Sequence, residues 1–200
     1  MIAELQTIPL QVLRCALTFS VLLVSCNPRE AQPPQDQTEL IETGNSVSDA
    51  LMKKLGTQLK TVLAAGNPAP AVRFCAQAAT PLTEQTSTEI PNATVKRVSM
   101  KFRNPVNKPD AVDVEILSRW EKQLQEGKPL PAYELKFTNE QVTRFYRPIR
   151  VQKMCLTCHG DKTSFKPELL SVLSTTYPDD RATGYSEGDL RGAFRVEISQ

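Results

Sequence analysis

The chain has few of the residues on which most active sites and metal sites depend. Its 200 residues include one histidine, eight glycines and five cysteines, and its basic and acidic side chains nearly balance at a formal charge of +2. One histidine leaves little for acid–base catalysis or for a histidine-rich zinc site. The balanced charge gives no reason to expect nucleic acid or an anionic membrane surface as a partner.

The N-terminus has no apolar run long enough to cross a membrane as a helix. The uncharged stretch Cys15–Ser25 has the length of a signal-peptide h-region. It ends in Leu23-Val24-Ser25-Cys26, which resembles the lipobox of bacterial lipoproteins, whose cysteine receives the diacylglycerol. We therefore predict a lipoprotein signal peptide over residues 1–25, with lipidation at Cys26. A plain secretory signal peptide or a short buried helix is the alternative.

A tether and one folded domain are expected to follow the signal peptide. The Pro/Gln-rich stretch 26–38 is typical of an extended linker, which leaves residues 39–200 for the domain. This arrangement predicts a protein on the periplasmic side of the cell envelope, held to the membrane by its lipid. Asn27 is not the aspartate associated with inner-membrane retention, which favours the outer membrane.

The cysteines do not make a disulfide framework. Cys15 lies in the signal peptide and Cys26 is the lipid site, so Cys75, Cys155 and Cys158 remain in the domain. Three cysteines in an exported protein always leave one thiol unpaired. Each thiol therefore needs another role.

The segment Cys155-Leu156-Thr157-Cys158-His159 supplies a role for two of the thiols. C-x-x-C-H is the attachment sequence of c-type haem. Thiols three residues apart lie close together on a helical turn, so both can form thioethers with the porphyrin vinyl groups, and the adjacent histidine becomes an axial iron ligand. A zinc half-site and a redox dithiol are the competing interpretations. Zinc needs four ligands, and only His159 and Cys75 remain to complete such a site.

Helical periodicity is strongest in Glu39–Ala65 and in Asp110–Glu126. Shorter helices are expected at Pro70–Ala79, closed by Pro81, and at Pro167–Ser174. The C-x-x-C-H motif is also expected on a helical segment.

Alternation of apolar and polar residues predicts strands between these helices. The predicted strands include Val98, Met100 and Phe102, and cover Ala132–Phe137, Val142–Pro148 and Ala193–Ser199, with a turn at Asn139-Glu140. Helices and strands are mixed without regular βαβ units. We therefore expect an α+β domain with a small antiparallel sheet, a long N-terminal helix and flanking helices.

Four stretches together resemble a family of small exported bacterial c-haem proteins with a Per-Arnt-Sim (PAS)-like fold. The same module occurs in the extracytoplasmic sensing part of some membrane histidine kinases. The resemblance covers about Glu39–Ser199, and the four stretches are Val72–Cys75, Arg103–Asp110, Cys155–Gly160 and Tyr177–Gly192. It implies a five-stranded PAS-like sheet preceded by helices, with haem bound against the sheet. It also implies iron ligation by histidine and cysteine, and Cys75 matches the ligating cysteine.

From the residues alone, the second axial ligand stays open between Cys75, a methionine, a lysine and no protein ligand. Met52 and Met100 are more simply core residues, and Met154 is adjacent to Cys155 and cannot reach the opposite face of the haem. If Cys75 binds as a thiolate, it favours ferric iron and lowers the reduction potential. We hypothesise that reduction weakens this bond and opens a site for CO or NO.

Other side chains near the haem are weaker predictions. Arginines pair well with carboxylates, so the candidates for the haem propionates are Arg73, Arg97, Arg103, Arg144 and Arg147. The aromatic residues that could line the pocket are Phe102, Trp120 and Tyr146, although core packing is their simpler role. Turn formation is the expected role of Asp179, Asp180 and Asp189.

These observations predict one covalent haem c in a protein that transfers single electrons or senses redox state or a gas. A redox or signalling protein is the expected partner. A small peroxidase-like enzyme is the alternative, but the only histidine is already assigned to iron, so we expect no enzyme activity. A zinc-binding lipoprotein module is the interpretation that remains if no haem is present.

Overall fold

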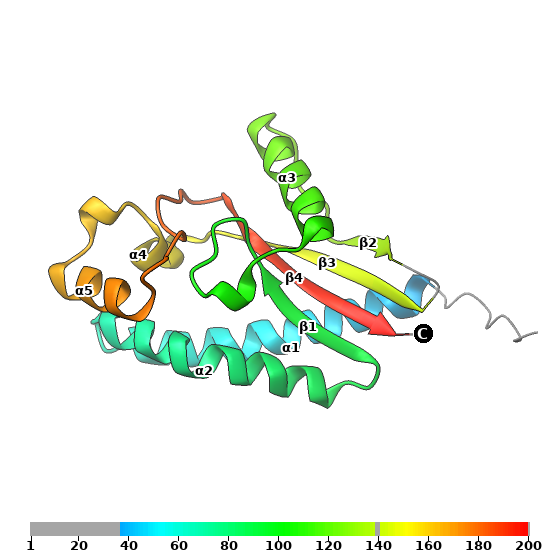
Figure 1. Cartoon of the computed structure of the whole chain (residues 1–200), viewed down its shortest axis with the longest axis horizontal. Coiled ribbons are helices and arrows are strands. Elements are labelled where there is room, and N and C mark those ends of the chain that lie inside the picture. Colours follow the sequence, from blue (N-terminus) through cyan, green and yellow to red (C-terminus); the bar gives the residue numbers. More distant parts are fainter. Residues whose placement is uncertain (1–36, 139–140, 200) are drawn as a thin grey trace, which may run out of the picture. The chain divides into compact units, whose positions relative to one another are not determined.

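The computed structural model describes residues 37–138 and 141–199 (Figure 1). The predicted signal peptide, the lipidation site Cys26, most of the predicted tether and the Asn139-Glu140 turn lie outside the described residues. Within those residues, every helix is too short or too polar to cross a membrane.

Two long helices open the domain. Helix α1 spans Gln37–Leu63 and buries Leu40, Val47 and Leu51 on its apolar side, which confirms the predicted long helix. Helix α2 spans Pro68–Glu89. It begins at Asn67, whose side chain accepts a hydrogen bond from the Ala69 N–H at 3.0 Å.

The predicted end of the second helix, before Pro81, is wrong. Helix α2 continues through Pro81 to Glu89. A proline inside a helix removes one backbone hydrogen bond. Helix α2 nevertheless packs against α1, β1 and α5, so tertiary packing outweighs the local cost.

Four strands form one antiparallel sheet with the order β1-β4-β3-β2. The strands are β1 (Ala93–Val98), β2 (Glu134–Phe137), β3 (Val142–Arg150) and β4 (Leu190–Ser199). The last three confirm the predicted strands, and the described residues thus form the expected α+β fold. The resemblance implied five strands, one more than the described part of the chain contains.

The predicted strand through Met100 and Phe102 is wrong, because β1 ends at Val98. There the Ser99 N–H donates to the carbonyl of Asn107 at 3.1 Å. The chain then folds into the short 3-10 helix η1 (Pro105–Asn107). Prolines and an Asn104 cap in this loop favour the turn over further strand pairing.

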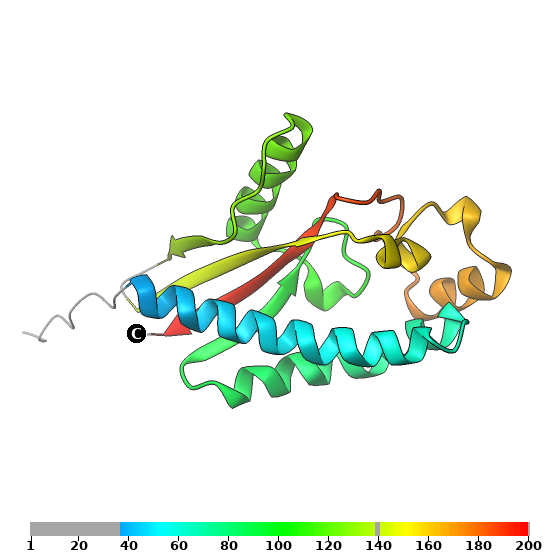
Figure 2. The ribbon, with the colours of Figure 1, turned by 180° about the vertical axis from the view of Figure 1, so that it is seen from behind.

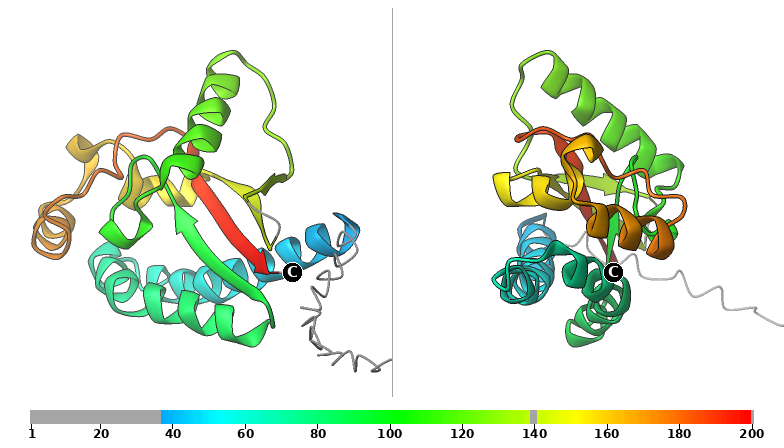
Figure 3. Two further views of the ribbon diagram at one scale, coloured as in Figure 1. Left: turned by 45° about the vertical axis from the view of Figure 1, so that its right-hand side comes forward. Right: turned by 90° about the vertical axis from the view of Figure 1, so that its left-hand side faces the viewer.

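The two faces of the sheet are covered by different helices (Figure 3). Helix α1 packs on one face, where the apolar side chains of Val47, Phe145 and Val196 meet. Gly44 lets α1 approach closely, because a Cβ there would overlap the Phe145 ring. Helix α3 (Ala111–Gln125) confirms the predicted helix and covers the other face with a cluster around Trp120.

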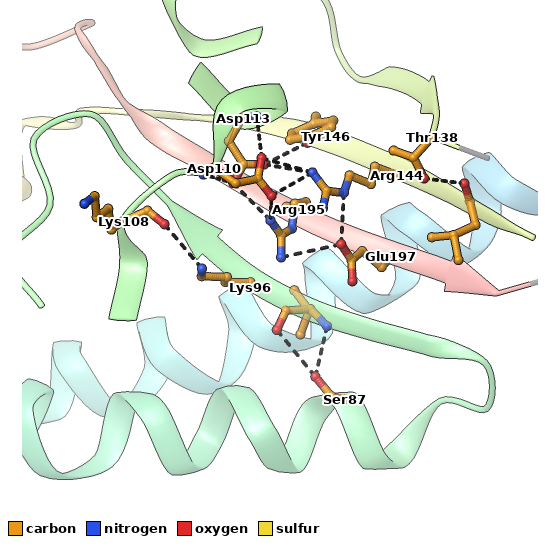
Figure 4. Close-up of polar contacts among 12 residues, drawn as sticks. Ser87, Lys96, Lys108, Asp110, Asp113, Thr138, Arg144, Tyr146, Arg195 and Glu197 are labelled. Atoms are coloured by element: carbon orange, nitrogen blue, oxygen red, sulfur yellow. Dashed lines mark hydrogen bonds and ion pairs between the residues drawn. The ribbon is translucent and has the colours of Figure 1, made fainter. Parts of the chain in front are cut away.

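Next to α3, this second face carries a polar cluster that we call the Asp113 network (Figure 4). Its members are Asp110, Asp113, Arg144, Tyr146, Arg195 and Glu197. Asp113 is fully buried, and it accepts hydrogen bonds from Tyr146 at 2.8 Å and from Arg195 at 3.0 Å. Asp110 and Asp113 also form the capping box at the start of α3.

The outer edge of β1 is partly closed by a side chain from α2. The Val95 N–H donates to Ser87 Oγ at 2.9 Å, and this hydroxyl lies 3.4 Å from the Val95 carbonyl oxygen (Figure 4). Helix α2 thus satisfies backbone groups that the sheet leaves unpaired at Val95.

The segment between β3 and β4 is mostly short helices. It contains η2 (Lys153–Cys155), α4 (Leu156–His159), η3 (Lys162–Ser164) and α5 (Pro167–Thr176). This segment lies at the end of the sheet that is next to the turn between α1 and α2, as Figures 1 and 2 show from opposite sides. This segment brings the C-x-x-C-H motif next to α2.

Candidate functional site

The C-x-x-C-H motif forms one irregular helical turn. Cys155 ends η2 and packs against the small apolar cluster of Val151, Ala182 and Tyr185. Cys158, on α4, packs against a cluster that includes Val72 of α2. Both are free thiols.

His159 is held through its ring and through its backbone. Its Nδ1 lies 2.7 Å from the carbonyl oxygen of Ala182, and its own carbonyl accepts from the Tyr185 N–H at 3.0 Å. A ring nitrogen beside a carbonyl carries the proton, so the other nitrogen, Nε2, keeps the lone pair that a metal requires. Burial, together with the cations Arg191 and Arg103, holds the pKa of His159 well below its usual range. The histidine is therefore in the neutral form of a ligand.

Cys75 comes to the same place from α2. Its thiol is largely buried, and burial raises its pKa, while Arg97 and Arg103 act in the opposite direction. The charge of Cys75 also influences Cys158, and helices α2 and α4 are in contact. The structure thus gathers all the predicted haem and iron residues of the domain into one region.

The alternative methionines lie in other surroundings. Met52 is 45% exposed on α1. Met100 packs in the Trp120 cluster under α3. Met154 is adjacent to the first attachment cysteine and lines a cavity with Lys60. Cys75 is therefore the sulfur ligand that this geometry favours, and its assignment stays a prediction.

Three arginines surround these residues, and we call them the cysteine-side arginines: Arg97, Arg103 and Arg191. Arg103 forms an ion pair with Asp180 at 3.1 Å and donates to the Cys158 carbonyl at 2.6 Å. It thereby ties the motif to the loop before β4.

Arg191 and Arg97 have no such carboxylate partner within hydrogen-bond distance among residues 37–138 and 141–199. Arg191 donates to Ser99 Oγ at 2.9 Å and lies against the ring of Tyr185. The Nε atom of Arg97 is enclosed without a hydrogen-bond partner. Burial lowers the pKa of both guanidiniums, which shows the cost of keeping them charged in this place.

The other predicted arginines do not lie in this cluster. Arg73 is exposed on α2. Arg144 belongs to the Asp113 network, and Arg147 pairs with Asp49 of α1 at 2.6 Å. The second face of the sheet, not the cysteine side, holds Arg144.

Some of the aromatic and acidic candidates likewise lie near the motif, and others lie elsewhere in the domain. Trp120 and Tyr146 are core residues under α3, as their simpler role predicted. Phe102 lies beside Arg181. Asp180 and Asp189 accept hydrogen bonds from nearby backbone N–H groups, which confirms their turn roles. Asp180 in addition pairs with Arg103, which the sequence did not predict.

Sequence reasoning missed Arg191, Tyr177 and Tyr185 as members of the site. The Tyr185 ring lies edge-on to the His159 ring, with 6.3 Å between the ring centroids. The charges of Cys75, Arg103 and Arg97 act on Tyr177. All three belong to the Gly-rich stretch Tyr177–Gly192 that carries part of the family resemblance. That stretch was the one available signal for them.

Two adjoining cavities of about 350 and 260 Å³ lie beside the motif. Both are lined by Gly66, Pro68 and Thr157. They place open space between the motif and the turn that joins α1 to α2.

The donor set suits haem better than zinc. No group of three or more His, Cys, Asp or Glu side chains in the described part of the chain is arranged to hold a metal ion. A structural zinc ion needs four such ligands, whereas haem iron takes four ligands from its porphyrin and two from outside it. Buried cations without carboxylate partners also fit a group that brings its own carboxylates.

Comparison with known proteins points to a family of haem proteins. A crystal structure described as that of the cyanobacterial heme-protein Tll0287 matches 84% of this chain and 97% of its own chain, with 26% sequence identity and a TM-score of 0.57. No curated protein matches the chain. The family model Tll0287-like matches residues 27–199. The chain therefore belongs to the Tll0287-like family.

Proposed function

We propose that this chain binds one haem c covalently through Cys155 and Cys158, with His159 and Cys75 as axial ligands, and that it acts in single-electron transfer or in the sensing of redox state or a gas. The observation that carries the proposal is the hydrogen bond from His159 Nδ1 to the Ala182 carbonyl. It fixes the imidazole in the neutral tautomer next to two cysteines with attachment spacing. A crystal structure that resembles this chain is described as that of a heme-protein, which supports the same cofactor.

Bound haem supplies one-electron chemistry at its iron. The protein's part is to hold the group and set its potential. His159 is kept neutral and oriented by the 182–185 segment, and Arg103 fixes the carbonyl of Cys158. Burial raises the pKa of the Cys75 thiol, and the cations Arg97 and Arg103 act in the opposite direction. The iron of a bound haem would therefore supply the main stabilisation of a negative sulfur at this place.

The proposal also places the protein on the periplasmic side of the cell envelope, anchored through a lipid on Cys26. Covalent haem attachment occurs outside the cytoplasm, which agrees with the predicted signal peptide. Cells fed a radiolabelled fatty acid are expected to label the wild-type chain but not Cys26→Ser. Equal labelling would exclude lipidation at Cys26.

The first test is a spectroscopic comparison of the wild type with Cys75→Ser, both exported in cells that attach c-type haem. We expect haem that resists acid extraction in both, and a ferric spectrum that shifts or turns high-spin only in Cys75→Ser. Met100→Leu is the matched control, and its spectrum is expected to match the wild type.

Two outcomes would contradict parts of this proposal. Covalent haem with identical spectra in Cys75→Ser would remove Cys75 from the iron and leave the attachment intact. A wild type without haem would overturn the proposed function itself. Added CO tests the hypothesis of an opening site, because a ferrous spectrum unchanged by CO would exclude it.

A further inference from the structure

The cysteine-side arginines have more positive charge than the chain itself neutralises. Arg103 is paired with Asp180, the carboxylate with which it forms an ion pair. Nearby Lys101 lies over the Tyr185 ring at 4.2 Å, and its charge acts on Glu121. Arg97 and Arg191 remain without a carboxylate in hydrogen-bond contact among the described residues.

A guanidinium cannot escape this situation by losing its proton. A charge that is withdrawn from water without a partner destabilises the folded state. The enclosed Nε of Arg97 is such a group, and the charge of Arg191 adds to the unfavourable field around it. An anion from outside the polypeptide therefore belongs at this place.

The charge of haem identifies that anion. Ferric iron, the dianionic macrocycle and one thiolate sum to zero, so the net charge that the group brings is that of its two propionates. Carboxylates pair well with arginine in planar, two-point contacts. We propose, on the basis of the haem function proposed above, that Arg97 and Arg191 form the binding site for the propionate carboxylates, and that Arg103 instead serves to hold the attachment motif.

The three arginines differ in the contacts that they already make within the chain. Arg103 uses Nε and Nη2 on Asp180 and on the carbonyls of Cys158 and Ala182, so its charge already has a carboxylate partner and its orientation is fixed by the chain itself. Arg191 donates through Nη1 to Ser99 Oγ and the Lys101 carbonyl, which orients the guanidinium and leaves donors free. The side chain of Arg97, on β1, makes no hydrogen bond to another side chain or to the backbone in the part of the chain that the structure describes.

The test measures the reduction potential of matured holoprotein in the wild type, Arg97→Gln, Arg191→Gln and Arg97→Lys. Losing a cation beside the propionates favours ferric iron. We expect each glutamine variant to shift the ferric–ferrous equilibrium about tenfold towards ferric, which is ~59 mV for one electron. Arg97→Lys keeps the charge and is expected to recover most of the potential.

Arg147→Gln is the matched control, because Arg147 is another sheet arginine but pairs with Asp49 of α1. Its potential is expected to equal that of the wild type. An infrared difference spectrum between the two redox states is expected to show shifted carboxylate bands in Arg97→Gln and unchanged bands in the control. Unchanged potential and bands in both glutamine variants would overturn the propionate assignment while leaving the haem function standing.

The wild type alone also tests the assignment, so the test does not depend on variants that fold. A buried pair is weakly screened, and the potential is therefore expected to change little between low and high salt. A free small anion could supply the same charge. A saturable response of the potential to added acetate or nitrate would show such an exchangeable anion and would overturn the propionate site. A wild-type protein that contains no haem would instead overturn the proposed function.

Discussion

The molecule contains two groups of arginines that differ in what they have as partners. In the Asp113 network, Arg144 and Arg195 face three carboxylates within 4 Å (Figure 4). On the cysteine side, Arg103 forms an ion pair with Asp180, and Arg97 and Arg191 have no carboxylate in hydrogen-bond contact among the described residues. Both arginines of the first group have carboxylate partners among the described residues, whereas two of the three arginines in the second group have none there.

This difference separates a structural role from a binding role. The Asp113 network joins the start of α3 to β3 and β4, and its arginines form ion pairs with its own carboxylates. The cysteine-side arginines lie beside the only histidine and the free thiols. An incomplete cluster of buried charges next to ligand atoms is typical of a functional site. Four predictions test the contrast.

The largest effect is expected in Asp113→Ala. This change removes the buried partner of Arg195 and Tyr146, so we expect a loss of about 3–5 kcal/mol in the free energy of unfolding. Urea denaturation followed by circular dichroism measures it. Asp49→Ala breaks the exposed pair with Arg147 and is expected to cost at most about 1 kcal/mol. Equal losses would show that the network is no stronger than a surface pair.

Asp180→Asn is expected to act on both stability and the haem. Breaking the largely buried pair with Arg103 costs about 3 kcal/mol. It also removes a negative charge near the haem, so the reduction potential is expected to rise, whereas Asp113→Ala leaves it unchanged. A potential in Asp180→Asn equal to that of the wild type would separate Asp180 from the haem.

A pair of tyrosine variants gives a smaller contrast. Tyr146→Phe loses a buried hydrogen bond to the Asp113 carboxylate and is expected to cost about 1.5–3 kcal/mol. Tyr185→Phe keeps the ring contacts with Lys101 and Arg191 and removes only a hydroxyl that acts on the charge of Arg191, so we expect a loss of at most about 0.5–1 kcal/mol. Thermal unfolding of both holoproteins measures the difference, and the reverse order would contradict it.

The smallest effect is the pH dependence that Asp110 contributes. Burial by itself raises the pKa of Asp110, but the Asp113 N–H and the guanidiniums of Arg144 and Arg195 lower it overall, below its ordinary 3.8. A lowered folded-state pKa stabilises the fold above the unfolded-state value, and this contribution is lost as the pH falls through the folded-state value. Urea midpoints between pH 7 and pH 3 are expected to fall less steeply in Asp110→Asn. Parallel curves would exclude this contribution.

Local signals were sufficient for much of the fold. The helix of Trp120 was predicted from its apolar period, and the later strands from simple alternation. Helix α2 was predicted too short, because Pro81 is a local stop signal that packing overrides. The end of β1 was missed because the local turn signals begin only at Asn104, and one contact that fixes the chain at Ser99, its hydroxyl bond to the Arg191 carbonyl, comes from a distant residue.

In the site, too, the residues fixed by local spacing were predicted and those placed by long-range contacts were not. The spacing of Cys155, Cys158 and His159 is local, so the sequence alone predicted the motif. Arg191 was missed because its position depends on the next residue, Gly192. Gly192 has a φ of 152°, and a Cβ added there would overlap the Val98 carbonyl oxygen. Only the folded sheet reveals that close approach, and with it the direction in which the start of β4 carries Arg191.

The contact between Ser87 and Val95 bears on how this protein behaves at high concentration. An open sheet edge offers free N–H and carbonyl groups on which a second chain can add a strand, and this is a common start of aggregation. One hydroxyl from α2 occupies both groups of Val95 in the middle of β1. The helix that carries Cys75 thereby also protects the sheet from self-association, so damage to α2 threatens the solubility of the chain along with its iron ligand.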